Sequence, residues 1–194
     1  METNNFDIIL PLLKFESEDH FYYLQILQRK KENEKLGSNS RVIRNYYIKS
    51  EKYLLDRKSE IIDLCNTFNA RAMLRLNRRS FEKVAYKAIQ NIANSMANRE
   101  FSFCGKSYDR AVGNGHIENE SLWILDIDEV SRKTNDMMLF IERECEPFGV
   151  KYICTIPSKN GFHLITTPFN LKEFKTIYTD IEVHKDNPTN LYIP

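Results

Sequence analysis

The stretch LWILDID at residues 122–128 gives the clearest fold signal in this 194-residue chain. A run of apolar residues is typical of a buried strand, and here the run ends in two acidic residues. The side-chain period of a strand is two, so Asp126 and Asp128 share one face while Ile127 points to the other. The stretch therefore predicts a buried strand that holds two carboxylates rigidly at an edge of a sheet.

The residues after this strand predict a mixed sheet with helices on one face. Helical patterns cover residues 132–146 and 171–178, and Pro147 and Gly149 end the first of them. Strand patterns cover four segments, residues 151–157, 161–167, 181–185 and 189–193. The resulting β-α-β-β-α-β-β order resembles a split βαβ or ferredoxin-like (RRM-like) sheet.

The first half of the chain predicts a separate α/β unit. Helices are expected over residues 19–35, 51–67 and 81–98, and strands over residues 41–48 and 70–77. Residues 99–121 contain three glycines and predict a long functional loop or a short hairpin. The expected fold class is therefore α+β with two lobes, a basic α/β lobe over residues 1–110 and an RRM-like lobe over residues 111–194, packed as one compact core.

Composition excludes several classes of protein. With 42% hydrophobic and 28% charged residues the chain is globular rather than disordered. No apolar run approaches the ~20 residues of a membrane span, and the first residues are acidic where a signal peptide is basic. The four cysteines form no C-x-x-C pair, so they predict reduced thiols and no zinc site. A cytoplasmic protein is expected.

The net charge of +1 hides a division of the chain. Residues 1–110 carry 20 Lys and Arg against 14 Asp and Glu, a net +6, whereas residues 111–194 carry 8 against 13, a net −5. Within the first part, residues 71–110 alone carry 9 against 3. A basic half and an acidic half suit different partners, an anionic polymer and cations respectively.

Asp126 and Asp128 are the first candidate site. Two carboxylates side by side repel each other, but a divalent cation between them makes the arrangement favourable, and Mg²⁺ prefers oxygen ligands. The alternative is that both are solvated acids at a strand end or helix caps. The same D-x-D pattern also occurs in unrelated metal-dependent transferases.

The segment SKNGFH at residues 158–163 is the second candidate. His163 alternates with apolar neighbours on a strand, and Ser158, Lys159 and the backbone N–H groups near Gly161 make an anion site beside it. An ordinary surface hairpin with a solvated histidine is the alternative. A third acid is expected on the last hairpin, at Asp180, Glu182 or Asp186, and strand alternation favours Glu182.

Basic residues of the first half form the last candidate. The predicted strand and the helix start after it carry four arginines, Arg71, Arg75, Arg78 and Arg79. A neighbouring strand region interleaves basic residues with tyrosines, a pattern that suits a phosphate backbone and stacked bases. A solvated basic face is the alternative.

Taken together, these motifs resemble the archaeo-eukaryotic primase superfamily, the primase-polymerases. WILDID is similar to the family's first motif, an apolar strand that ends in Asp-x-Asp or Asp-x-Glu. Gly161-Phe162-His163, with Ser158 upstream, is similar to the second motif, and Ile181-Glu182 is the assignment for the third. The resemblance covers residues 122–194, while the first half matches only as a generic α/β lobe.

The resemblance implies a small catalytic core that makes or extends primers. Asp126, Asp128 and Glu182 would bind two Mg²⁺ or Mn²⁺ ions, and His163 would act with the two aspartates in catalysis. Ser158, Lys159, Gly161 and His163 would bind a nucleoside triphosphate, and the four arginines a single-stranded DNA or RNA template. A replication helicase or another replication protein is an expected partner. A non-catalytic primase-like module that binds nucleic acid, and an unrelated D-x-D transferase such as a nucleotide-sugar enzyme, are the alternatives.

Overall fold

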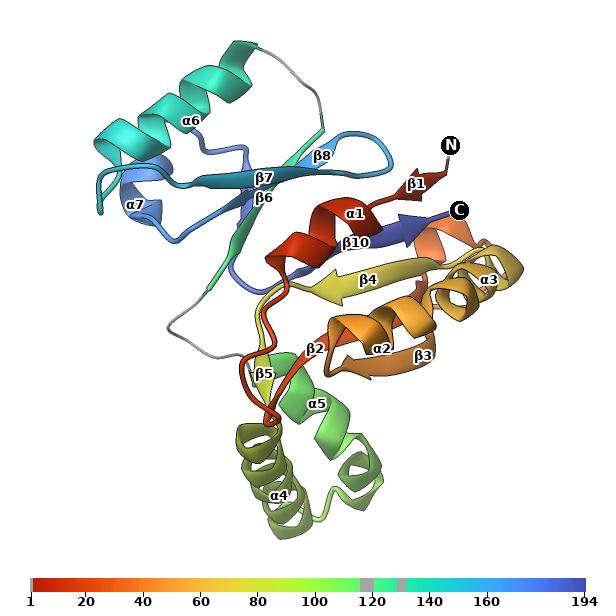
Figure 1. Cartoon of the computed structure of the whole chain (residues 1–194). Helices are drawn as coiled ribbons and strands as arrows, with labels where there is room; N and C mark the ends of the chain where they lie inside the picture. Colours follow the sequence, from red (N-terminus) through yellow and green to blue (C-terminus); the bar gives the residue numbers. More distant parts are fainter. Residues whose placement is uncertain (1, 116–120, 129–131) are drawn as a thin grey trace.

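The computed structural model describes residues 2–115, 121–128 and 132–194. These residues form two antiparallel sheets with helices packed on them, so the expected α+β class is confirmed (Figure 1). The first sheet has the order β1-β10-β4-β2-β3, with β5 paired to β2. The second has the order β7-β8-β6-β9.

The first sheet combines strands from both ends of the chain. Its strands are β1 (Thr3–Asn4), β2 (His20–Gln28), β3 (Arg41–Ile48), β4 (Arg71–Arg75), β5 (Arg79–Ser80) and β10 (Pro188–Ile193). The strands predicted over residues 41–48 and 70–77 are confirmed as β3 and β4. The two termini consequently lie side by side, β1 pairing with β10 (Figure 1).

Strand β2 contradicts the helix predicted over residues 19–35. Tyr22, Leu24 and Ile26 face one hydrophobic core, while Phe21 and Tyr23 face another. Because both faces are apolar, the alternation that marks a half-buried strand is absent from the sequence. The aromatic and β-branched content of the segment, which favours strands, was the better guide.

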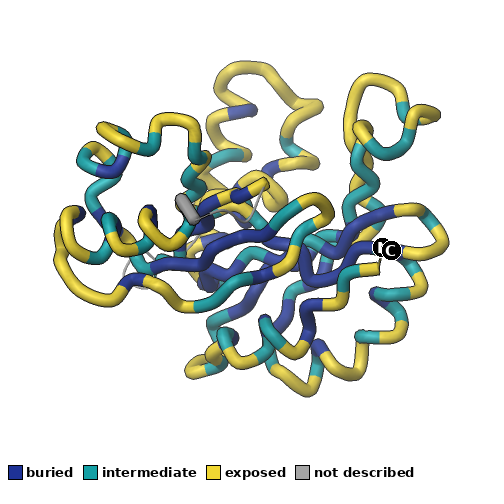
Figure 2. The backbone as a smooth tube through the Cα atoms, turned by 90° about the horizontal axis from the view of Figure 1, so that it is seen from above, coloured by how far each residue is buried: buried dark blue, intermediate teal, exposed yellow. Residues whose placement is uncertain are grey.

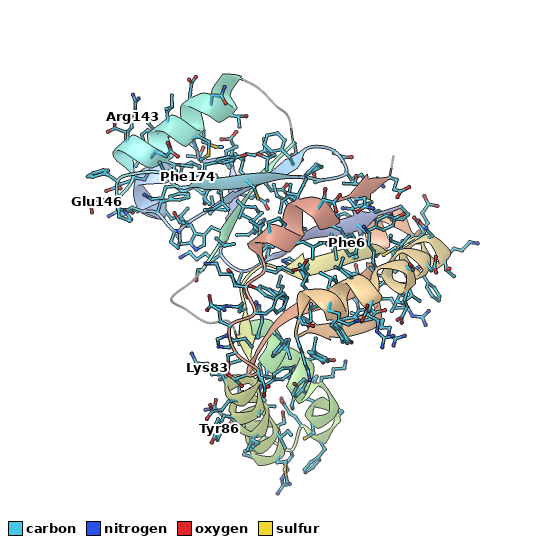
Figure 3. All side chains as sticks on the ribbon, in the orientation of Figure 1. Phe6, Lys83, Tyr86, Arg143, Glu146 and Phe174 are labelled. Carbon is cyan, nitrogen blue, oxygen red and sulfur yellow. The ribbon has the colours of Figure 1, made fainter. Side chains whose placement is uncertain are left out.

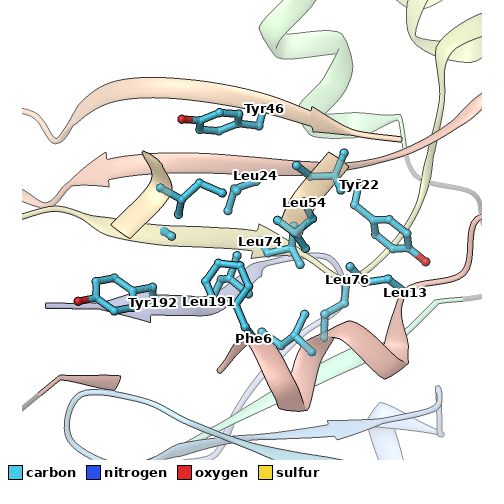
Figure 4. Close-up of a cluster of buried hydrophobic side chains, with 14 of the residues drawn as sticks. Phe6, Leu13, Tyr22, Leu24, Tyr46, Leu54, Leu74, Leu76, Leu191 and Tyr192 are labelled. Carbon is cyan, nitrogen blue, oxygen red and sulfur yellow. The ribbon is translucent and has the colours of Figure 1, made fainter. Parts of the chain in front are cut away.

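Three short helices cover one face of the first sheet, α1 (Phe6–Ile9), α2 (Glu51–Asp56) and α3 (Lys58–Phe68), with the 3₁₀ turn η1 (Leu10–Leu12) after α1. The single helix predicted over residues 51–67 is divided at Arg57 into α2 and α3. Ser50 caps α2 by accepting a hydrogen bond from the Tyr53 N–H. Their apolar faces enclose the core drawn in Figure 4, which includes Leu24, Leu74 and Leu191.

The opposite face of the first sheet is covered at one end by α4 (Phe81–Ala97) and α5 (Ser107–Asn114), joined by the 3₁₀ helix η3 (Phe101–Lys106). Helix α4 confirms the prediction over residues 81–98, and Ser80 caps it through the Lys83 N–H. The long loop predicted over residues 99–121 is wrong for residues 101–114, which are helical, and residues 116–120 lie outside the described part. In Figure 1 this helical pair extends below β5.

The second sheet is formed by β6 (Trp123–Ile127), β7 (Tyr152–Pro157), β8 (Phe162–Thr166) and β9 (Glu182–His184). Helices α6 (Arg132–Glu144) and α7 (Leu171–Phe174) lie on one face, as predicted. Alternate residues of β6, Trp123, Leu125 and Ile127, pack against these helices. Their neighbours Ile124 and Asp126 therefore point toward the first sheet.

The last strand changes the expected division of the chain. Residues 189–193 were predicted beside residues 181–185, but β10 pairs with β1 and β4 of the first sheet. Alternation did not reveal this, because β10 is buried along almost its whole length. The expected boundary at residue 110 also falls inside α5. The chain thus enters the second sheet once and returns to the first.

One hydrophobic core spans both sheets. Ile124, Ile156 and Ile165 of the second sheet belong to the same buried cluster as Phe6 and Leu191 of the first. The Asn5 amide donates to the carbonyl oxygens of Pro157 at 2.9 Å and Asn190 at 2.8 Å, and so joins the sheets with hydrogen bonds. Figure 2 shows the buried backbone as a continuous band through the middle of the molecule.

Two sequence predictions concern the chain as a whole. Among the described residues, no helix has the length and apolar character that crossing a membrane requires. The four cysteines are free thiols: Cys65 and Cys145 are buried, and Cys104 and Cys154 are partly buried. Burial raises the pKa of Cys65 to about 12, which makes it a packing residue rather than a nucleophile.

Candidate functional site

A row of side chains crosses the second sheet on the face turned toward the first sheet. Asp126 of β6 is opposite His163 of β8 and opposite Glu182 of β9. Ile156 of β7 completes the row beside His163. Directly opposite residues of antiparallel strands point to the same face, so the register brings together three residues that the sequence separates by up to 56 positions.

We call Asp126, His163 and Glu182 the polar row. The next row of side chains shows where the polar row lies relative to the hydrophobic core. Ile165, Ile124 and His184 occupy the next positions on β8, β6 and β9. The two isoleucines are buried in the core that joins the sheets, whereas Asp126 is 44% exposed in its side chain. The polar row therefore lies where the core ends and solvent begins.

His163 is the buried member of the row. Its Nδ1 lies 2.7 Å from the Thr189 hydroxyl of β10, and its Nε2 lies 3.6 Å from Asp126 Oδ1. Burial lowers the pKa of His163 below its ordinary value of 6.5, and the Asp126 carboxylate opposes this shift only in part. The imidazole is consequently neutral at pH 7. When Thr189 donates its hydroxyl proton to Nδ1, Nε2 carries the ring proton and donates toward the open side of the row.

The acidic residues differ in how tightly they are held. Glu182 is exposed, and its Oε2 lies 3.2 Å from Nε2 of His184 on the same strand face. Asp128 follows the end of β6 and is exposed. Within the described residues, no group of three or more His, Cys, Asp or Glu side chains is gathered closely enough to hold a metal ion. The donors are nevertheless carboxylate oxygens on one sheet face, which is the ligand chemistry of Mg²⁺ and Mn²⁺.

The structure separates the three candidates for the third acid. Asp186 has a structural role, because its Oδ2 lies 2.5 Å from Arg79 and 3.4 Å from Arg75. Asp180 lies in the turn before β9 and is exposed. Glu182 is in register with Asp126. Among the three, only the Glu182 position adjoins the aspartate on the sheet.

The turn between β7 and β8 lies against the end of β6. Ser158 and Gly161 close it: the Ser158 N–H donates to the Gly161 carbonyl at 2.9 Å, and the Gly161 N–H donates to Ser158 Oγ at 3.2 Å. The predicted use of the Gly161 N–H for an anion is thus replaced by this internal bond. A Cβ at Gly161 would overlap the Ile127 carbonyl oxygen and approach Asp128 Cα to 2.8 Å. Glycine is required here because the two backbones touch.

The four arginines do not form the open basic surface that the sequence predicted. Arg79 has no exposed surface and donates to Asp186 and to the carbonyl oxygens of Asn77 and Val112. This is a correction for Arg79, because a buried guanidinium does not reach a template. A buried charge requires such partners.

The other three arginines are also engaged in ion pairs. Arg78 is buried and bonds Glu16 at 2.9 Å, and Arg75 binds Asp186. Arg71 is buried too, at the start of β4, and pairs with Glu32. Of these three, Arg71 lies beside the polar row, because it contacts Asn190, whose neighbour Thr189 binds His163.

Glu32 connects Arg71 to the turn between β7 and β8. It ends the 3₁₀ turn η2 (Lys30–Glu32) in the β2–β3 connection. Its Oε2 accepts from Arg71 Nε at 2.9 Å, and its Oε1 accepts from Arg71 Nη2 and from Lys159 Nζ, the latter at 3.1 Å. Three segments that are distant in the sequence meet at this carboxylate.

Sequence reasoning missed three residues that shape the site. Thr189 positions His163, Glu32 bridges the two cations, and Asn77 joins β4 to the second sheet through the backbone of Leu122 and Lys185. Thr189 and Asn77 are buried polar residues in segments of ordinary composition, and no local pattern distinguishes them. The charge run KKENEK over residues 30–35 contains Glu32 but predicts only a solvated surface.

A comparison of the chain with protein-family models, curated proteins and solved structures found no match. A hollow of about 1010 Å³ is lined by residues that include Trp123, Phe148 and Phe169, and Trp123 points to the helix-covered face of the second sheet, away from the polar row.

Proposed function

We propose that this chain is a primase-like nucleotidyltransferase that synthesises or extends primers on a nucleic-acid template. The observation that carries the proposal is the cross-strand register of Asp126, His163 and Glu182 on β6, β8 and β9. The sequence resemblance required the acids and the histidine to share one site. Had His163 pointed to the helix-covered face of the sheet, the resemblance would have been accidental.

The topology of the second sheet supports the same proposal. The elements from β6 to β9 follow the order β-α-β-β-α-β, and the strands lie as β7-β8-β6-β9 with antiparallel neighbours. This order supports the proposal of a split βαβ, RRM-like unit with both helices on one face. In the proposed function, this unit would bind the metal ions and the nucleotide. The first sheet would form the second lobe.

Asp126, Asp128 and Glu182 would hold two Mg²⁺ or Mn²⁺ ions. The bound ions would supply Lewis-acid activation of a primer 3′-hydroxyl and charge neutralisation at the leaving pyrophosphate. The protein contributes a central strand for Asp126, a position beyond the end of that strand for Asp128, and the edge strand for Glu182. The three carboxylates would have to move closer together when the ions bind, because they are not gathered in the described structure.

His163 and Lys159 would bind the triphosphate. A neutral imidazole held at Nδ1 by Thr189 keeps its Nε2 directed beside Asp126, where a phosphate oxygen would lie. Lys159 is half-exposed at the tip of the neighbouring turn, so its ammonium group is accessible to the phosphates of a nucleotide that binds from solution. Ser158 retains its hydroxyl proton as a donor while accepting from the Gly161 N–H.

A single-stranded DNA or RNA template would lie across the uncovered part of the first sheet. Asn190, Met73, Gln25 and Asn45 form one row across β10, β4, β2 and β3. Met73, Gln25 and Asn45 are partly exposed and uncharged, which suits base edges better than the ion-paired arginines do. At one end of this row, Asn190 Oδ1 lies 3.5 Å from Arg71 Nη1, beside the proposed position of the nucleotide. Primer synthesis of this kind would take place in the cytoplasm. A replication helicase or another replication protein would be the partner.

The decisive experiment is a primer-synthesis assay. Wild-type protein with a single-stranded template, nucleoside triphosphates and Mg²⁺ or Mn²⁺ should give template-dependent products. Asp126→Asn and Asp128→Asn should abolish them while leaving the thermal unfolding midpoint close to that of wild type, because the like charges contribute no stability without metal. Asp180→Asn, an exposed acid in the turn before β9, is the matched control and should retain activity.

The same assay separates the alternatives. A protein that binds single-stranded nucleic acid but forms no product under any of these conditions is a non-catalytic primase-like module. The pairing of Glu182 with His184 favours that candidate, because it engages the third acid. An unrelated D-x-D transferase would bind a nucleotide-sugar and would be insensitive to His163→Ala.

A further inference from the structure

Arg71 and Lys159 are two cations that converge on one carboxylate. Glu32 receives two hydrogen bonds from the Arg71 guanidinium, one per oxygen, and one from the Lys159 ammonium group. The Arg71 and Glu32 side chains are 7% and 15% exposed, whereas Lys159 is 53% exposed. The cluster therefore has a buried, fixed side and an open side, and its formal charge without Glu32 is +2.

The backbone that carries Glu32 is fixed independently of its side chain. The Asn69 amide donates to the Glu32 carbonyl oxygen at 3.3 Å, and the neighbouring Asn33 donates to the carbonyl oxygens of Arg29 and Asn69 at 3.0 and 3.1 Å. Rotation about the side-chain bonds of Glu32 thus frees both cations without moving the loop. A carboxylate on a flexible stem is suited to exchange with another anion.

The geometry points to a polyphosphate-binding site on Arg71 and Lys159 that Glu32 occupies in the ligand-free protein. A bidentate guanidinium and an ammonium group are the donors that recognise phosphate oxygens, and the Glu32 carboxylate satisfies them in its place. The inference rests on the proposed function, because it assigns the β- and γ-phosphates of the incoming nucleotide to this pair. Nucleotide binding then requires Glu32 to swing out, which makes Glu32 an internal competitor.

The electrostatics of Glu32 agree with the geometry. Burial raises the pKa of Glu32, but the hydrogen bonds and charges of Arg71 and Lys159 outweigh that effect and hold the pKa below its ordinary value of 4.5. The carboxylate is therefore fully ionised at neutral pH, and it competes with phosphate as an anion. Removing the negative charge of Glu32 should therefore strengthen the binding of polyphosphate to Arg71 and Lys159.

The test measures binding of inorganic triphosphate by calorimetry, without divalent cations, to wild type and to Glu32→Gln. The variant should bind about tenfold more tightly, the effect of removing one charge-assisted competitor. Glu34→Gln, an exposed acid on the same loop, is the matched control and should bind as wild type does. Adding Lys159→Gln to Glu32→Gln should remove the gain.

Each result is decisive for the inference. Unchanged or weaker binding by a folded Glu32→Gln protein overturns it and makes Glu32 a purely structural partner of Arg71. If Glu32→Gln fails to fold, Glu32→Asp, which keeps the charge on a shorter stem, should tighten binding by a smaller factor, and no gain there overturns the inference equally. Because no metal or template is used, failure here leaves the primer-synthesis result untouched, and failure of primer synthesis leaves this binding result untouched.

Discussion

Gly161 sets the distance between the β7–β8 turn and the end of β6. A Cβ at this position would overlap backbone atoms of Ile127 and Asp128, which do not move as a flexible side chain would. Gly161→Ala should therefore displace the turn and destabilise the protein by about 1–3 kcal/mol, the range for overpacking. Chemical denaturation measures the change.

Gly37→Ala provides the control for this substitution. No atom lies within 4 Å of a Cβ built at Gly37, so that variant should have nearly wild-type stability. Equal stability of the two variants would contradict the close contact between the turn and β6. At this scale the sequence predicted that the N–H groups near Gly161 bind an anion, whereas the structure shows that glycine at this position permits two backbones to touch.

The connection between β9 and β10 holds the carboxylate that compensates a buried arginine. Asp186 lies in it and pairs with the fully buried Arg79, while the Asn77 amide donates to the other carboxylate oxygen at 3.2 Å. Asp186→Ala leaves the Arg79 charge uncompensated and should cost about 3–5 kcal/mol of folding free energy. Thermal or denaturant unfolding gives the value.

Asp180→Ala, six residues earlier in the sequence and exposed, should change stability by less than about 0.5 kcal/mol. A small effect of Asp186→Ala would show that Arg79 finds another partner.

The connection between β9 and β10 also shows why sequence patterns alone do not predict a buried ion pair. The burial of Arg79 beneath Asp186 depends on three segments meeting in space, and no local sequence pattern records it.

Element types could be predicted where hydrophobic patterns were one-sided. Strand β4 and helices α4 and α6 bury one face and follow their expected boundaries closely. Strands β2 and β10 are buried on both faces, so β2 does not follow the helix predicted for it and β10 pairs in the other sheet than expected. Pairing partners depend on tertiary packing, and no local pattern records them.

At the scale of the whole molecule, the charge division of the sequence has a different meaning from the one expected. Four of the nine Lys and Arg residues of residues 71–110, namely Arg71, Arg75, Arg78 and Arg79, form ion pairs with Glu32, Asp186 and Glu16. The positive charge of these four arginines therefore serves the fold. Asp126 and Glu182 of the second sheet, by contrast, are exposed.

The shared core predicts that both sheets unfold together. Ile124, Ile156 and Ile165 of the second sheet are buried with residues of the first, so neither sheet can open without exposing the other's core. Trp123 is the only tryptophan and lies in the second sheet, so its fluorescence reports on that sheet, while far-UV circular dichroism reports on the whole chain. The two signals should give one midpoint in denaturant.

Truncation of one joining residue tests the same coupling. Ile165→Ala should destabilise the protein by about 2–5 kcal/mol and shift both signals equally, because the residue is fully buried in the common core. Ile177→Ala, at a position that is 60% exposed, should leave both midpoints near their wild-type values. Separate midpoints for fluorescence and dichroism would instead mean that the second sheet folds as an independent unit. The Asp126 row would then be anchored by its own helices α6 and α7 rather than by the first sheet.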